Sequence, residues 1–248
     1  MEEKKKGGKR AAPSRRGWLL VALVLAGLGI WGILEWRAHT APGPGISVNE
    51  EALTRREPFY QYDAPGVTAR AGVDVSSYQG VVDWPAVKAA GADFAMLRVG
   101  FRGYGTGALV EDNAFAQNAA DAANAGLTVG VYFYSQAVTE EEAAEEARFV
   151  VERLRGTNVS GPIAYDLEFY TADEARTDDL TGEQATQNAL AFCDVIRQAG
   201  YEPVVYMNLH WAGSMYGMEE LAHLPVWLAS YGPVPVSYTH LTLPTTPY

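Results

Sequence analysis

The chain has 248 residues, a formal net charge of −11 and a single cysteine. Without the basic first 16 residues, which carry +5, the remainder has a net charge of about −16. A domain this acidic is not expected to bind nucleic acid through its general field, and it has no polybasic attraction to an anionic membrane surface. One cysteine excludes an intrachain disulfide framework and any cysteine-rich metal site, and Cys193 is expected to be a small core residue of an amphipathic helix.

The first 36 residues have the pattern of a membrane anchor. Residues 1–16 carry seven Lys and Arg, and residues 18–34 then run without a charge. As a helix, that run spans about 26 Å, close to the roughly 30 Å hydrocarbon core of a bilayer. We therefore expect a basic cytoplasmic leader at 1–16 and a single transmembrane signal anchor at 17–36, with the remainder outside the cytoplasm. The alternative is a cleaved signal peptide and a secreted protein.

Two further segments flank the main pattern. Residues 37–70 are rich in Pro, Gly and charges without a sustained period, which is typical of a stalk or linker. Residues 236–248 carry no charge, continue no preceding pattern and resemble a translated sequencing adaptor, so we expect a non-native tail. The domain proper is then 71–235, which is long enough for one sizeable core.

Strand and helix signals alternate along that domain. Strands are expected at 71–77, 94–100, 127–135, 162–169, 202–208 and 224–230, and helices at 83–91, 112–125, 139–156 and 181–200. Thr139 and Glu142 form a capping-box pattern, and the acidic run 140–146 is expected to be a solvated helix face. Strands that alternate with helices pair in parallel through right-handed crossovers, which predicts an α/β fold.

Two α/β arrangements are compatible with this alternation, a doubly wound sheet and a (β/α) barrel. The segment SSYQGVVDW follows the first strand in place of a glycine-rich phosphate loop, which disfavours a nucleotide fold. Every predicted strand carries polar or aromatic residues at its carboxyl end, namely Asp74, Ser76, Arg98, Tyr132, Tyr134, Asp166, Glu168, Tyr206, Asn208, Trp227 and Tyr231. A TIM-like barrel gathers these ends on one face, where barrel enzymes hold their active sites, so we predict a barrel.

The strand at 162–169 ends in two acidic residues. Alternation points Asp166 and Glu168 to the same side, with Cα atoms about 6.6 Å apart. Neighbouring carboxylates raise each other's proton affinity, so one can donate a proton while the other stays charged. This pair suits cleavage of a glycosidic bond, and the surrounding Tyr and Trp offer faces for sugar rings. The alternative is a strand end that simply meets solvent.

Six segments together resemble the glycoside hydrolase family 25 lysozymes, the Chalaropsis-type muramidases. They are GVDVSSYQGVVDW, LRVGFRGYGTG, GVYFYSQA, AYDLE, VVYMN and PVWLASY, over about 71–231. The resemblance implies hydrolysis of the β-1,4 bond between N-acetylmuramic acid and N-acetylglucosamine in peptidoglycan, without a metal or organic cofactor. The family closes its barrel with two further strands, the last of which carries another acid. We expect this chain to lack them through C-terminal truncation, which can leave the product inactive.

Carried over residue by residue, the resemblance makes Glu168 the general acid, Asp166 its carboxylate partner and Asp74 a further active-site acid. It also implies a set of residues that line the saccharide cleft, Tyr134, Tyr206, Asn208, Trp227 and Tyr231. Arg98 either binds substrate or neutralises the acids. Phe133 stands where the family often has His.

Two other functions remain open at this point. A non-catalytic module that binds cell-wall glycan could keep the aromatic cleft without turnover. Another hexosaminidase, such as a chitinase-like barrel, also ends a strand in an acidic D-x-E pattern. The longer acidic run of that class is absent here, because Ile163 and Ala164 precede Tyr165 and Asp166.

Overall fold

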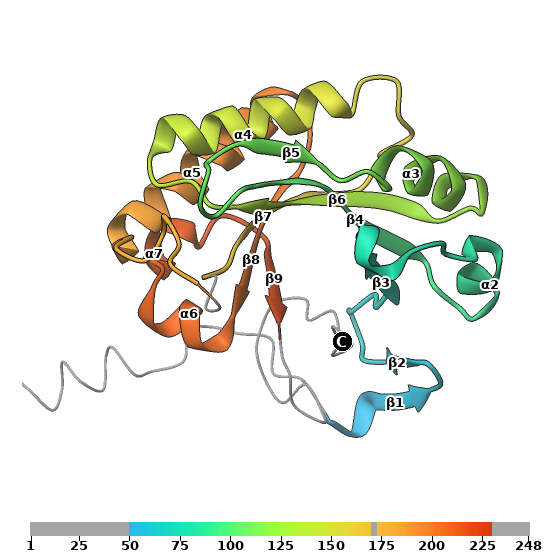
Figure 1. Cartoon of the computed structure of the whole chain (residues 1–248). Coiled ribbons are helices and arrows are strands. Elements are labelled where there is room, and N and C mark those ends of the chain that lie inside the picture. Colours follow the sequence, from blue (N-terminus) through green and yellow to red (C-terminus); the bar gives the residue numbers. More distant parts are fainter. Residues whose placement is uncertain (1–49, 170–172, 230–248) are drawn as a thin grey trace, which may run out of the picture. The chain divides into compact units, whose positions relative to one another are not determined.

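A curled sheet of parallel strands is the centre of the computed structural model, which describes residues 50–169 and 173–229 (Figure 1). The parallel strands follow the chain order across the sheet: β3 (Gly72–Val75), β4 (Phe94–Arg102), β6 (Thr128–Ser135), β7 (Ile163–Leu167), β8 (Pro203–Asn208) and β9 (Val226–Ala229). β5 (Leu109–Glu111) pairs antiparallel with β4. The predicted α/β class with parallel strands is confirmed. In the described part of the chain the sheet is open, with β3 and β9 at its edges.

Helices follow most strands, as the alternation predicts. They are α2 (Trp84–Ala89), α3 (Phe115–Asn124), α4 (Glu140–Arg153), α5 (Gly182–Gln198), α6 (Leu209–Ser214) and α7 (Met218–Leu221). Side-chain caps start four of them, because Asp83, Thr139, Thr181 and Asn208 each accept a backbone N–H three residues ahead. α4 and α5 lie side by side against one face of the sheet (Figure 1).

The sheet separates two apolar regions, as expected for parallel strands that are buried on both faces. On the helix side, Tyr165 and Leu167 join a large core with Phe133 and Phe192. The opposite face carries a smaller set, which we call the inner cluster: Met96, Tyr132, Ala164, Val204, Tyr206, Trp227 and Ala229. Alternation along each strand therefore sends one set of side chains to the helices and the other to the concave side.

Glycines hold the strands close together near the amino end of β6. A Cβ atom on Gly130 would lie 2.5 Å from Met96 Sδ and 2.9 Å from the Pro162 carbonyl oxygen. A Cβ atom on Gly161 would lie 2.9 Å from Gly130 Cα. Neither position has room for a side chain, so the backbone is closely packed at the amino ends of these strands.

Two features of the described chain differ from expectation, and the first is a hairpin within the predicted stalk. β1 (Leu53–Arg56) pairs antiparallel with β2 (Phe59–Tyr62), and Phe59 packs against the helix-side core. Neither LTRR nor FYQY shows a clear alternation of apolar and polar residues, which is why the pattern missed these strands.

The second difference concerns the acidic start of α4: Glu140, Glu141 and Glu145 are exposed as expected, but Glu142 and Glu146 are not. Glu146 is fully buried, and its Oε1 accepts the Nε–H of Arg102 at 2.7 Å. Glu142 pairs with Arg176 at 2.6 Å and accepts the backbone N–H of Val138, so the predicted box closes one residue early. Residues four apart share a helix face, so Glu142 and Glu146 both turn toward the sheet.

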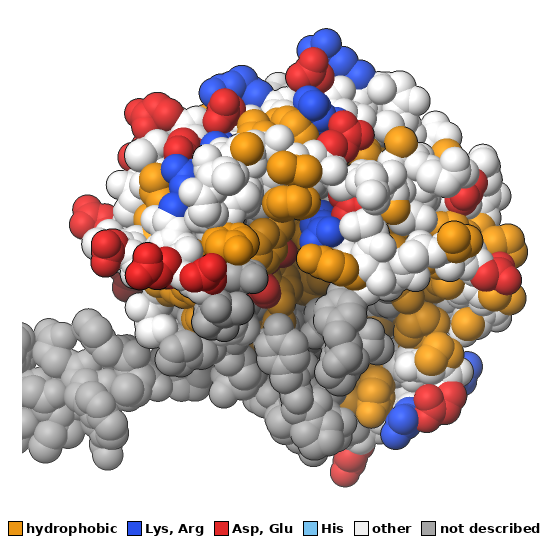
Figure 2. All heavy atoms as spheres, viewed as in Figure 1, with side chains coloured by type: hydrophobic (Ala, Val, Ile, Leu, Met, Phe, Trp, Pro, Cys, Tyr) orange, Lys and Arg blue, Asp and Glu red, His pale blue; other side chains and the backbone are white. Residues whose placement is uncertain are grey.

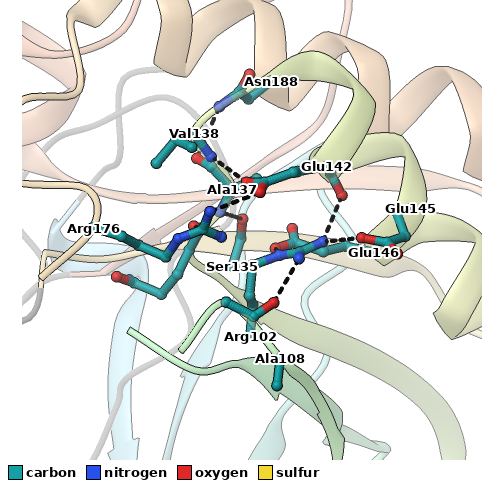
Figure 3. Close-up of polar contacts among 12 residues, drawn as sticks. Arg102, Ala108, Ser135, Ala137, Val138, Glu142, Glu145, Glu146, Arg176 and Asn188 are labelled. Carbon is teal, nitrogen blue, oxygen red and sulfur yellow. Dashed lines mark hydrogen bonds and ion pairs between the residues drawn. The ribbon is translucent and has the colours of Figure 1, made fainter. Parts of the chain in front are cut away.

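We call Arg102, Glu142, Glu145, Glu146 and Arg176 the outer network (Figure 3). The Arg102 guanidinium also donates to Glu145 at 2.7 Å, to the Gly107 carbonyl at 2.7 Å and to the Glu142 carbonyl at 3.0 Å. Burial raises the pKa of Glu146 to about 7, while the Ser135 hydroxyl and Arg102 oppose that rise. The outer network ties α4 to the end of β4.

Cys193 lies on the buried side of α5 and is 1% exposed. Burial raises the pKa of its thiol to about 12. The expected role as a small core residue is confirmed.

Several expectations fall outside the described residues. They concern the leader at 1–16, the anchor at 17–36, the first part of the stalk, Tyr231 and the tail at 236–248. Within 50–169 and 173–229, we find no helix with the length and apolar character needed to span a membrane.

Candidate active site

Three carboxyl groups come together at the carboxyl ends of β3 and β7. Asp166 is in register with Tyr134 of β6 and with Tyr206 of β8, and Glu168 directly follows β7. Ala164 belongs to the inner cluster, so alternation turns Asp166 toward the same concave side. Asp74 lies on edge strand β3, and the charge of Glu168 acts on both Asp74 and Asp166. We call Asp74, Asp166 and Glu168 the acid cluster.

The acid cluster retains protons more strongly than isolated carboxyl groups would. Burial raises the pKa of Asp166 well above its ordinary value, and the charges of Glu168 and Asp74 add to this rise. Burial also raises the pKa of Asp74, with a further contribution from Glu168. The pKa of Glu168 is raised by burial, against a lowering by its hydrogen bond with Tyr206. Such mutual effects are what a proton-donating site needs.

An aromatic wall stands beside the acid cluster. The Trp227 ring meets the rings of Tyr206 and Tyr132 edge-on, at centroid distances of 5.1 Å and 5.9 Å. The Tyr134 hydroxyl lies 3.5 Å from the backbone carbonyl oxygen of Glu168. In the space-filling view, hydrophobic side chains gather in a hollow on the viewed face, with acidic side chains beside it (Figure 2).

Two buried polar atoms of this face have no hydrogen-bond partner within the described residues. They are Oδ1 of Asp166, an acceptor, and Nε1 of Trp227, a donor. Buried polar atoms in folded proteins are nearly always paired. An unpaired donor and an unpaired acceptor beside the acid cluster are therefore available to a polar ligand.

Arg98 is held mainly by a carboxylate outside the acid cluster. Its Nε donates to Asp112 Oδ2 at 2.8 Å and its Nη2 to Ser77 Oγ at 3.1 Å. Asp112 also accepts two backbone N–H groups, and despite burial these bonds lower its pKa. The charge of Arg98 also acts on the acid cluster through space. It lowers the pKa of Asp166, but burial and the neighbouring acids raise that pKa by more.

Asn208 has a structural task as well as its place near the wall. Its side-chain oxygen accepts the Trp211 backbone N–H at 3.0 Å and so caps α6.

The comparison with known proteins decides the family. The family model of the glycosyl hydrolases family 25 matches residues 73–245, well over half of the chain. The chain belongs to this family. The match continues past Pro235, into the segment for which we expect a non-native tail.

Individual relatives of this family 25 chain are distant. It is 26% identical over 161 residues to the autolytic lysozyme of Clostridium acetobutylicum, covering 65% of this chain and 45% of that protein. It is 28% identical over 179 residues to lysozyme M1 of Streptomyces globisporus, covering 65% of this chain and 54% of that protein. The chain thus spans about half the length of these curated relatives.

A solved structure shows the same fold. The lysozyme of Streptomyces coelicolor superposes with a TM-score of 0.55 at 23% identity, covering 72% of this chain and 82% of that chain. At that identity the likeness concerns the fold.

Gln136, Asp112 and Ser77 were not predicted, although each contacts a predicted site residue. Gln136 donates its amide to the Glu168 carbonyl at 2.6 Å. Gln136 and Asp112 lie just beyond the ends of β6 and β5, where strand alternation no longer predicts direction. Within 50–169 and 173–229, no group of three or more His, Cys, Asp or Glu side chains is arranged to hold a metal ion.

Proposed function

We propose that this family 25 domain is a muramidase, which hydrolyses the β-1,4 bond between N-acetylmuramic acid and N-acetylglucosamine in peptidoglycan. The observation that carries the proposal is the acid cluster, in which Asp166 and Glu168 share a buried site and both have raised pKa values. Lysozymes among the curated relatives support it.

In the proposed reaction Glu168 is the general acid. Its carboxyl group follows the end of β7 and is less enclosed than that of Asp166, so it can reach a glycosidic oxygen. Proton transfer from Glu168 accompanies cleavage of the bond between the anomeric carbon and that oxygen. The carboxylate left on Glu168 then takes a proton from the attacking water, which restores the acid.

Asp166 has the role of carboxylate partner in this proposal. It either orients the 2-acetamido group of the substrate or stabilises positive charge at the anomeric carbon. Its unpaired Oδ1 is an acceptor for such a contact. Asp74 adds negative charge nearby and helps to keep the shared proton on the cluster.

The aromatic wall provides the saccharide cleft in the proposal. Trp227 and Tyr206 offer ring surfaces, and the unpaired Nε1 of Trp227 offers a donor to a sugar hydroxyl. Tyr134, Asn208 and Tyr231 complete the proposed lining, while Arg98 acts through its charge and its bond with Asp112.

The experiment uses the full chain and purified peptidoglycan. New reducing ends are reduced with borohydride, and the products are hydrolysed and identified. A muramidase yields muramitol, whereas a hexosaminidase that cuts the alternate bond yields glucosaminitol. Sedimentation with peptidoglycan without either product would replace the enzyme with a glycan-binding module.

We also propose that the domain is a TIM-like barrel carried outside the cytoplasm by the anchor at 17–36 and the stalk at 37–70. The support is the uncharged run after seven basic residues. Fractionation of a C-terminally tagged full chain tests the location. Recovery from the membrane fraction is expected, and a mature N-terminus near Ala41 in the medium would replace the anchor with a signal peptide.

A further inference from the structure

The backbone of Glu168 is held by a side chain. Strand pairing of β7 ends at Leu167 with β6 and at Asp166 with β8, so Glu168 lies beyond both ladders. Its carbonyl oxygen instead accepts the Nε2–H of Gln136 at 2.6 Å. That bond replaces the strand pairing that would otherwise fix the position of Glu168.

Gln136 is itself fixed in orientation. The side chain is fully buried, and its Oε1 accepts the Thr177 hydroxyl at 3.0 Å. Because the oxygen of the amide faces this donor, the nitrogen must face the Glu168 carbonyl. Gln136 therefore forms hydrogen bonds with both Glu168 and Thr177, the two ends of the connection that follows β7.

The outer network holds the same connection from the helix side. Arg176 pairs with Glu142 at 2.6 Å (Figure 3). It also donates to the backbone carbonyl of Gln136 at 3.2 Å. Arg102 in turn donates to the Glu142 carbonyl. A chain of bonds thus runs from the end of β4 to the proposed acid.

We propose that Gln136 is a positioning residue for Glu168, an inference that rests on the proposed function. Gln136 acts through the backbone and keeps the Glu168 carboxyl beside Asp166 and Tyr206. Without its amide, the Glu168 carbonyl loses its shortest partner and the segment after β7 can shift. A displacement of about 1 Å at a reacting group can reduce the rate about a hundredfold.

The test compares Gln136→Met with Asn188→Leu. Asn188 is also fully buried and donates its amide to the neighbouring carbonyl of Ala137 at 2.9 Å, but it does not contact Glu168. On soluble peptidoglycan fragments, Gln136→Met should lower kcat at least about tenfold with KM nearly unchanged. Asn188→Leu should lower the melting temperature comparably and leave kcat within about twofold.

A second measurement does not depend on turnover. Carbon-13 NMR of labelled glutamate follows the titration of the Glu168 carboxyl, which Glu168→Gln assigns. In Gln136→Met the pKa of Glu168 should fall toward its ordinary value as the carboxyl becomes more exposed, and Asn188→Leu should leave it in place. Thr177→Val, which retains Gln136 but frees its orientation, should give a smaller shift of the same sign.

The outcomes separate the two proposals. If the wild-type chain releases no muramitol but the Glu168 titration responds to Gln136→Met, the proposed function fails and the positioning role stands. If folded Gln136→Met or, should that variant not fold, Thr177→Val retains the wild-type titration, the positioning role is overturned. Unchanged kcat in those variants, with an active wild type, overturns it as well.

Discussion

The protein gathers acidic side chains in two places that differ in their partners. In the outer network, Glu145 and Glu146 each lie 2.7 Å from a nitrogen of Arg102, and Glu142 lies 2.6 Å from Arg176. In the acid cluster no ion pair is found among the described residues, and Arg98, whose charge lowers the pKa of Asp166, is bonded to Asp112.

The difference shows how the same residue types serve structure or chemistry. Glu142, bonded to the Arg176 guanidinium, stays charged, as its lowered pKa indicates. Burial raises the pKa of Glu146 to about 7 despite its bond with Arg102, and that bond holds α4 to β4. Carboxyl groups that face each other without a bonded cation retain a proton that can be transferred. The two regions meet at Gln136, whose backbone contacts Arg176 and whose side chain contacts Glu168.

The largest effect is expected from breaking the acid cluster. Glu168→Gln keeps the size of the side chain but removes the proton donor, so release of muramitol should fall by about 10²–10⁴-fold or more. Thermal unfolding should change little, since no ion pair is lost. Asp166→Asn should also be severe. Wild-type turnover by folded Glu168→Gln would remove Glu168 from the role of acid.

A large loss of stability is expected from breaking the outer network. Arg102→Met leaves Glu146 buried without its cation, which typically costs about 3–5 kcal/mol at pH 8. The loss should be smaller at pH 5, because the pKa of Glu146 rises further without Arg102 and the neutral acid needs no cation. Urea unfolding at both pH values measures the difference, and an equal loss at both would contradict it.

The titration of Glu146 predicts a pH dependence of the wild-type chain. Its pKa is raised by burial from 4.5 when unfolded to about 7, so between these values the folded state binds more protons than the unfolded state. Stability from this group is therefore present at low pH and lost as pH rises toward 7, by roughly 3 kcal/mol at most. Glu146→Gln should remove that part of the slope in urea unfolding curves, and an unchanged slope would assign it to other groups.

The smallest expected effect tests how Tyr206 influences the pKa of Glu168 in the acid cluster. Tyr206→Phe removes the hydrogen bond that lowers the pKa of Glu168, so this pKa should rise. A general acid with a higher pKa stays protonated to higher pH, so the basic limb of the pH–rate profile should move upward. A downward movement would contradict the assignment of that limb to Glu168.

Much of the fold was predicted from short-range patterns. Alternation identified the parallel strands and brought Asp166 and Glu168 to one side, and the helix starts at Thr139 and Thr181 were marked by their caps. Partners far apart in sequence were not predicted. Glu146 looks solvated until Arg102, 44 residues earlier, is placed beside it.

Gln136 was missed for a similar reason. It lies 32 residues from Glu168, and a polar residue just after a strand has no pattern that predicts burial. Hydrophobic periodicity predicts which face of a helix or strand is buried. It does not predict two buried polar groups that form a hydrogen bond with each other.

The only cysteine of the chain, Cys193, is buried, so a cysteine introduced at an exposed position can be labelled site-specifically. Thiol reagents attack the thiolate, and a side chain that is 1% exposed with a pKa of about 12 offers almost none at neutral pH. Tyr78, which lies in the short 3-10 helix Ser77–Gln79 after β3 and stacks on Arg98, is 81% exposed. A fluorophore attached in Tyr78→Cys would be the single dye on the native background, and its emission could report the arrival of a glycan strand in real time.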